Sequence, residues 1–182
     1  MDVVTDDDVT DLREQLLWSV QLSSRYHMRR QAFFERWSRG TAAVGVIFGS
    51  SAVGGILSTT TRRWLIGIAG AVTAIMSTTD LVVGTAFLAR RHEDLRKRFI
   101  ALESEIRRVA TPSDATVADW HVKRLDIEVD EPPVYCRIIL LCENELAGAH
   151  GLAPRTSVAR WVRWTSHFHR WENLSPKPQR ES

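Results

Sequence analysis

The chain has 182 residues, enough for one domain or for a membrane hairpin with soluble flanks. Its formal net charge of +2 is nearly balanced, so net charge does not indicate a nucleic-acid-binding protein. The two cysteines, Cys136 and Cys142, fit neither a disulfide framework nor a zinc site and suit a reducing compartment.

The N-terminal part contains an acidic lead followed by an amphipathic helix. Residues 1–10 carry the acidic lead, which argues against a secretory signal peptide. Residues 11–39 alternate apolar and charged side chains in a pattern typical of a helix with one apolar face. We expect this helix to lie in the cytoplasm.

Two long windows almost free of charge follow. A quarter of all residues are charged, yet residues 40–61 contain none and residues 64–89 contain only Asp80. Each window exceeds the roughly 20 residues that a membrane-spanning helix needs. The windows are therefore predicted to be two transmembrane helices. The alternative is a buried helical hairpin in a soluble all-α protein, but a surface helix would show a polar stripe.

The residues that flank the two windows predict how the hairpin is oriented. Trp37 precedes the first window and Trp64 opens the second, as aromatic residues do at membrane interfaces. Arginines are concentrated outside the two outer ends, whereas the turn carries only Arg62 and Arg63. Because positive charge is retained on the cytoplasmic side, both termini are predicted to be cytoplasmic.

Small residues recur in both windows at spacings that allow close packing of helix backbones. These residues are Gly45, Gly49, Ser51, Gly55, Gly67 and Ala71. They indicate either packing within the hairpin or self-association.

A polar stripe occupies the second window. Thr73, Ser77, Asp80 and Gly84 follow one another at spacings of four, three and four, which predicts one helix face. Such a stripe should face protein or water. One hypothesis makes Asp80 a pore-lining acid in an oligomer. The other makes it a structural partner for an arginine such as Arg39 or for hydroxyl groups.

The second window is expected to continue into a cytoplasmic helix over residues 90–110. Its apolar residues alternate in steps of three and four and form a heptad seam. The seam residues are His92, Leu95, Phe99, Leu102, Ile106 and Val109. The seam could join two subunits or pack on the N-terminal helix, and each apolar member is expected to be buried. His92 is interpreted as a polar seam residue, with a protonation role as the alternative.

Further short cytoplasmic helices are predicted over residues 111–150, separated by the double proline at Pro132 and Pro133. In the stretch "KRLDIEVDEPP", Arg124 and Glu128 stand one helical turn apart and should form a weak ion pair. We expect Asp126 or Glu128 to meet Arg137 or an arginine between positions 90 and 98.

The C-terminal part is basic and rich in tryptophan. Over residues 155–174 the aromatic residues recur at helical spacing between arginines, and the tryptophans are Trp161, Trp164 and Trp171. This helix could lie in the membrane interface or dock on the helical core. Residues 175–182 are expected to be a disordered tail. His167, His169 and Glu172 have too weak a spacing to predict a metal site, and we expect no metal or cofactor.

No catalytic signature occurs in the sequence, so an enzyme is not expected. There is no glycine-rich phosphate loop, no zinc-protease motif and no nucleophile elbow. The fold class that follows is an all-α membrane protein. It has a two-helix transmembrane hairpin, long helices that extend into the cytoplasm and a small cytoplasmic helical part.

The layout resembles the SLATT family over about residues 11–148. The similarity rests on "YHMRRQAFFERW", the two windows, the late aspartate, "RRHEDLRKRFIALESEI" and "KRLDIEVDEPP". The matching positions are Asp80, His92, Leu95, Arg124, Asp126, Glu128, Glu131 and Pro132. The resemblance implies a two-span effector of a bacterial conflict or antiphage system. It would form a homo-oligomeric pore in the lipid bilayer of the bacterial inner membrane and depolarise that membrane.

We expect no sensor domain within this chain, so the resemblance also implies a separately encoded sensor protein as the trigger. The alternative function is a non-conducting membrane anchor or scaffold that recruits a cytosolic partner. A nucleic-acid partner is not expected.

Overall fold

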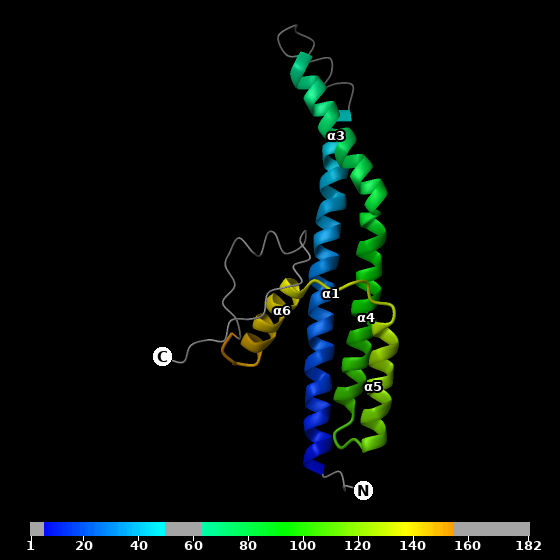
Figure 1. Cartoon of the computed structure of the whole chain (residues 1–182), viewed down its shortest axis with the longest axis vertical. Helices are drawn as coiled ribbons and strands as arrows, with labels where there is room; N and C mark the ends of the chain where they lie inside the picture. Colours follow the sequence, from blue (N-terminus) through cyan, green and yellow to red (C-terminus); the bar gives the residue numbers. More distant parts are fainter. Residues whose placement is uncertain (1–5, 50–62, 155–182) are drawn as a thin grey trace. The chain divides into compact units, whose positions relative to one another are not determined.

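The computed structural model describes residues 6–49 and 63–154, which form long helices joined by short connections (Figure 1). The helices are α1 (Asp6–Gly49), α3 (Arg63–Val83), α4 (Thr85–Arg108), α5 (Asp114–Glu128) and α6 (Cys136–Ala149). The described residues contain no strand, which confirms the all-α prediction. The predicted segments 155–174 and 175–182, and the residues from 50 to 62, lie outside the described residues.

Helix α1 includes parts of three predicted segments: the acidic lead, the amphipathic helix and the first transmembrane window. It begins at Asp6, inside the predicted lead, and continues past residue 39 into the first predicted transmembrane window. Three aspartates stand at its start, where the helix dipole favours negative charge. No proline interrupts the segment, and Gly40 and Gly45 only weaken a helix without ending it.

The second predicted window is not one helix. Helix α3 ends at Val83 and α4 begins at Thr85, and Gly84 between them has a φ of +64°. Only glycine adopts this left-handed conformation at little cost. The prediction that the second span runs straight into the cytoplasmic helix is therefore wrong, because residues 70–83 and α4 are bent by 41°.

The chain divides into two compact units, one made of residues 1–30 with 92–182 and the other of residues 31–91. In the first unit, α1, α4 and α5 lie side by side (Figure 1). Their apolar faces share one core cluster: Val9, Leu16 and Val20 from α1, Leu95, Phe99, Leu102 and Ile106 from α4, and Val117, Trp120 and Ile127 from α5.

The seam of α4 is therefore used inside the chain. Leu95, Phe99, Leu102 and Ile106 are buried, and Val109 packs on the cluster as a partly buried residue. Burial of each such side chain is worth roughly 1.5–3 kcal/mol. Of the two partners considered for the seam, the N-terminal helix is the one observed, together with α5.

Local signals explain where α5 begins and ends. The Ser113 side chain accepts a hydrogen bond from the Thr116 backbone N–H at 3.2 Å, as an N-cap residue does. Beyond Glu128 the chain reaches Pro132 and Pro133, which cannot continue a helix because they lack an N–H group. Helix α6 then packs on α1 in a second cluster, formed by Tyr26, Ile138 and Cys142.

The second unit holds the rest of α1, all of α3 and the start of α4. Among the described residues, no helix by itself has the length and apolar character required to cross a membrane. The bent pair of residues 70–83 and α4 meets these criteria only when its two parts are taken together.

Candidate functional site

The candidate residues predicted from the sequence lie mainly in two places in the structure. The first is the predicted polar stripe of α3. Thr73 and Asp80 are half-buried and Ser77 is exposed, on successive turns of the same helix. Gly84 does not extend the stripe, because it lies outside both helices.

Asp80 connects the two sides of the bend. Its carboxylate accepts a hydrogen bond from the hydroxyl of Thr85, the first residue of α4. Its backbone carbonyl accepts the Gly84 N–H at 2.9 Å, and the Gly84 carbonyl accepts the Leu88 N–H at 2.9 Å. Of the partners considered for Asp80, a hydroxyl group is thus the one present. This arrangement fastens the end of α3 to the start of α4.

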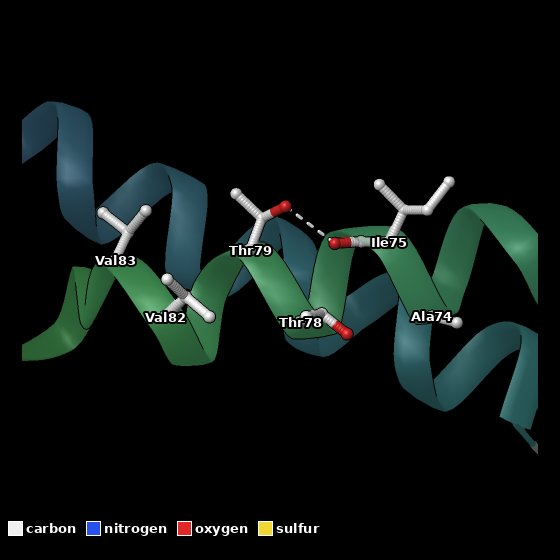
Figure 2. Close-up of a pocket in the computed structure, with 6 residues that line it drawn as sticks. All are labelled: Ala74, Ile75, Thr78, Thr79, Val82 and Val83. Atoms are coloured by element: carbon white, nitrogen blue, oxygen red, sulfur yellow. Dashed lines mark hydrogen bonds between the residues drawn. The ribbon is translucent and has the colours of Figure 1, made fainter.

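The outer surface of α3 around this bend is apolar. Ile75, Leu81 and Val82 are exposed, with Leu81 the most exposed at 84%. Figure 2 shows two rows of side chains that line a shallow groove: Ile75, Thr79 and Val83 in one, Ala74, Thr78 and Val82 in the other. The Thr79 hydroxyl donates to the Ile75 carbonyl at 2.8 Å within the helix.

The small residues that are described at the predicted packing positions do not pack tightly against another helix. A Cβ atom built on Gly45 or Gly67 would meet nothing within 4 Å, and Ala71 is exposed. Close packing within the hairpin at these positions is therefore not observed. The surroundings of Gly49 are not described, and Ser51 and Gly55 lie outside the described residues.

The predicted interfacial tryptophans are described in only one case. Trp37 is half-buried, and its ring lies 6.3 Å from that of Phe33. The side chain of Trp64 is not described, and Trp161, Trp164 and Trp171 lie outside the described residues.

The second place is a group of polar and aromatic side chains in contact inside the first unit, which we call the histidine cluster. Its members are Tyr26, His27, His92, Glu131 and Tyr135. His27 Nδ1 lies 2.9 Å from His92 Nδ1, and His27 Nε2 lies 2.9 Å from Glu131 Oε1. The His27 side chain is fully buried and that of Glu131 is 15% exposed.

These distances restrict where the hydrogens lie. Glu131 as a carboxylate can only accept, so His27 Nε2 donates to it. Between the two Nδ1 atoms, one must carry a hydrogen and the other a lone pair. Two imidazolium rings would bring two N–H groups against each other. The geometry therefore fits a single hydrogen shared between the two histidines.

Aromatic rings enclose the histidines. Phe99 stacks on His27 with ring centroids 5.6 Å apart, and Tyr26 meets His27 edge-on at 5.3 Å. The Tyr26 hydroxyl accepts the Tyr135 backbone N–H at 3.3 Å, and burial raises the pKa of Tyr26. The Arg30 guanidinium lies 4.5 Å from the centre of the Tyr135 ring, and burial lowers its pKa.

The cluster fastens three distant segments of sequence together: α1, α4 and the connection between α5 and α6. It offers protonatable side chains: two imidazoles, one carboxylate and two phenols. The described residues contain no group of three or more His, Cys, Asp or Glu side chains arranged to hold a metal. His27 stands between its two partners, so the three donors do not converge on one point.

Charged residues of the "KRLDIEVDEPP" stretch behave partly as expected. Arg124 pairs with Glu128 at 2.7 Å, which confirms the predicted pair. Arg98 bonds the backbone carbonyl of Asp126, so an arginine between positions 90 and 98 does meet Asp126, but through the main chain. The carboxylate that Arg98 bonds is that of Asp130, which the sequence did not single out.

Sequence reasoning named His92 and Glu131 but missed His27, which joins them. A usable signal exists in the spacing. Val20, His27 and Phe34 follow one another at intervals of seven on α1, and Val20 and Phe34 are buried. A histidine at a heptad position between two core residues predicts a buried ring, which needs a hydrogen-bond partner.

Comparisons with protein families, with curated proteins and with solved structures found no match for this chain.

Proposed function

We propose that the chain is an oligomeric effector of a bacterial conflict or antiphage system that acts at the inner membrane. Its hairpin, formed by the end of α1, the residues up to 62 and α3, would insert into the lipid bilayer with both termini in the cytoplasm. When a separately encoded sensor activates it, the oligomer would open a path for ions. The family part of this proposal rests on the resemblance described above.

The observation that carries the membrane proposal is the exposed apolar surface of α3. Ile68, Ile75, Leu81 and Val82 are each more than half exposed, and Asp80 is the only charged residue between positions 64 and 89. A soluble protein rarely leaves a contiguous apolar surface of this kind without a partner. Lipid chains would cover it on all sides.

The polar groups of α3 support the same proposal. The Thr79 hydroxyl bonds a carbonyl of its own helix, and Asp80 and Thr85 bond each other. Within a bilayer, polar groups must be satisfied inside the protein because no water is present. The hydroxyl groups of Thr79 and Thr85 thus donate to acceptors within the chain.

A non-conducting membrane anchor is the second candidate, and one observation favours it. Asp80 is bonded to Thr85 across the bend, as a structural residue would be. In an anchor, Asp80 would serve only to hold α3 against α4. In a pore, its charge would also face the ion path.

Reconstitution of the full chain into liposomes, followed by ion-flux measurement, tests these functions. Asp80→Asn keeps an oxygen that accepts the Thr85 hydroxyl but removes the charge, whereas Asp94→Asn removes an exposed charge from α4 as the matched control. A pore predicts flux in the wild-type protein that changes only in Asp80→Asn. Stable insertion without flux would support the anchor, and failure to associate with liposomes would overturn both.

A further inference from the structure

Helix α5 presents an apolar stripe to its surroundings on the face opposite the core. Val117, Trp120 and Ile127 are buried, whereas Val122, Leu125 and Val129 are 56%, 58% and 84% exposed. Ala115 and Ala118 are also exposed and extend the stripe. We call these exposed positions the α5 stripe: Ala115, Ala118, Val122, Leu125 and Val129.

The spacing of the α5 stripe is that of a coiled-coil seam. Its members follow one another at intervals of three, four, three and four. This is the pattern by which one helix receives the side chains of another. The described residues of the first unit leave the α5 stripe exposed, because the core cluster takes the other face of the helix.

Carboxylates border the α5 stripe on both sides. Asp114, Asp119 and Asp126 are exposed, and Glu128 is half-buried. The nearby cations neutralise part of this charge: Lys123 bonds Glu105 and Asp119, and Arg124 bonds Glu128. Four carboxylates against two cations still leave the border with an excess of negative charge, so two α5 stripes would repel each other at these positions.

The sequence contains a complementary segment at residues 155–174, outside the described residues. Trp161, Trp164, Phe168 and Trp171 recur at intervals of three, four and three. Between and beside them stand four arginines: Arg155, Arg160, Arg163 and Arg170. An apolar seam with basic borders matches an apolar seam with acidic borders in both spacing and charge.

We propose that the Trp- and Arg-rich segment of one copy docks on the α5 stripe of a second copy. In Figure 1, α5 and α6 lie on opposite sides of the pair formed by α1 and α4, and the described chain ends at Pro154, just after α6. Few residues separate Pro154 from Val158, where the apolar pattern starts. A neighbouring copy therefore offers a more accessible stripe than the same chain does.

This arrangement is head-to-tail, because each copy gives its C-terminal segment and receives that of another. Such contacts form closed rings when the rotation between copies closes. The proposal gives the oligomer of the proposed function a specific contact. It stands independently of ion conduction, because an anchor could assemble in the same way.

Charge reversal in the full chain tests the proposal, with the association constant in detergent measured by analytical ultracentrifugation. Asp119→Arg with Asp126→Arg should weaken association by about tenfold or more, and Arg160→Glu with Arg163→Glu should do the same. Mixing the two variants should restore association, because the basic stripe of one variant then meets the acidic segment of the other. The matched control is Asp94→Arg, an exposed aspartate on α4 outside the stripe.

A second pair of variants tests the apolar contact. Leu125→Ala should also weaken association, whereas Leu152→Ala, which removes a leucine of similar exposure (57%), should not. Unchanged association in Leu125→Ala, or no restoration on mixing the reversed variants, would overturn the proposal. Loss of liposome binding in the arginine variants with an unchanged oligomer would also overturn it, because the segment would then bind lipid.

Discussion

Glu131 accepts a hydrogen bond from a fully buried histidine although it stands in an irregular connection rather than in a helix. Glu131→Ala would leave His27 Nε2 without its carboxylate, and an unpaired buried donor costs about 1–3 kcal/mol. We expect the free energy of unfolding in urea to fall by that amount. Glu128→Ala, which removes only the surface pair with Arg124, should cost about 0.3–0.5 kcal/mol. Equal losses in the two variants would mean that the histidine cluster adds no stability.

The two cysteines should differ in reactivity. Cys136 is exposed, whereas Cys142 is buried and desolvation raises the pKa of its thiol to about 12. Because the thiolate is the reacting form, we expect a thiol reagent at neutral pH to modify Cys136 in the folded protein and Cys142 only after unfolding. Mass spectrometry of the labelled peptides measures this. Rapid labelling of both residues in the native protein would contradict the burial of Cys142.

The same raised pKa predicts lower stability at alkaline pH. The unfolded thiol ionises near pH 9, whereas the folded thiol stays protonated up to about pH 12. The folded state therefore binds more protons within this window, and stability must fall as the pH rises, by about 1.4 kcal/mol per unit at most. In urea unfolding between about pH 8 and pH 11, the free energy of unfolding should fall less for Cys142→Ala than for the wild-type protein.

At the scale of the elements, Gly84 determines that α3 and α4 are two helices. Its φ of +64° would place a Cβ atom in a conformation that costs roughly 1–2 kcal/mol for an L-residue. The nearest side-chain atom would be Phe87 Cβ at 3.9 Å, so space is not the obstacle. We expect Gly84→Ala to lower the melting temperature. Gly148→Ala, inside α6 with nothing within 4 Å, should raise it slightly.

The opposite result for Gly84→Ala would be informative. If α3 and α4 joined into one straight helix, the substitution would be neutral or stabilising, because alanine is the better helix former. The helical signal in circular dichroism would then increase. That outcome would show that the bend is not required by the packing around it.

At the scale of the whole molecule, periodic patterns predicted the helical character of residues 6–49 and 63–154 but not the partners of each helix. The three- and four-residue steps of α4 predicted which side chains are buried, because burial of a helix face depends on periodicity alone. Whether that face meets another chain or α1 depends on tertiary packing, which one sequence does not specify. Gly84 looked like a member of a polar stripe, since a glycine can occupy either a helix or a left-handed turn.

The histidine cluster could be predicted only in part for a related reason. His92 and Glu131 stood in noticeable motifs, but their link is His27, 65 residues before His92. Contacts between distant segments leave no periodic trace in the sequence. The apolar windows, in contrast, are local features of the sequence. Their lack of charge can be read without knowing any contact, and it corresponds to the exposed apolar surface of α3.

Leu102 lies at the centre of the core that α1, α4 and α5 share, and it is 4% exposed. Leu102→Asp would remove about 1.5–3 kcal/mol of apolar burial and place an unpaired charge in the core at a cost of several kcal/mol more. Together these losses approach the net free energy of about 5–15 kcal/mol that stabilises a typical domain. We therefore expect the first unit to lose its cooperative unfolding transition.

The second unit should respond differently, because Leu102 belongs to the first unit and α3 to the second. Amide hydrogen exchange should become fast in α4 beyond His92 and in α5, while α3 and liposome association remain unchanged. Ala101→Asp, which adds the same charge at an exposed neighbouring position of α4, should leave exchange in the first unit slow. If Leu102→Asp left exchange in α5 unchanged, the shared core would not be what holds the first unit together. If it abolished liposome association as well, the two units would fold as one.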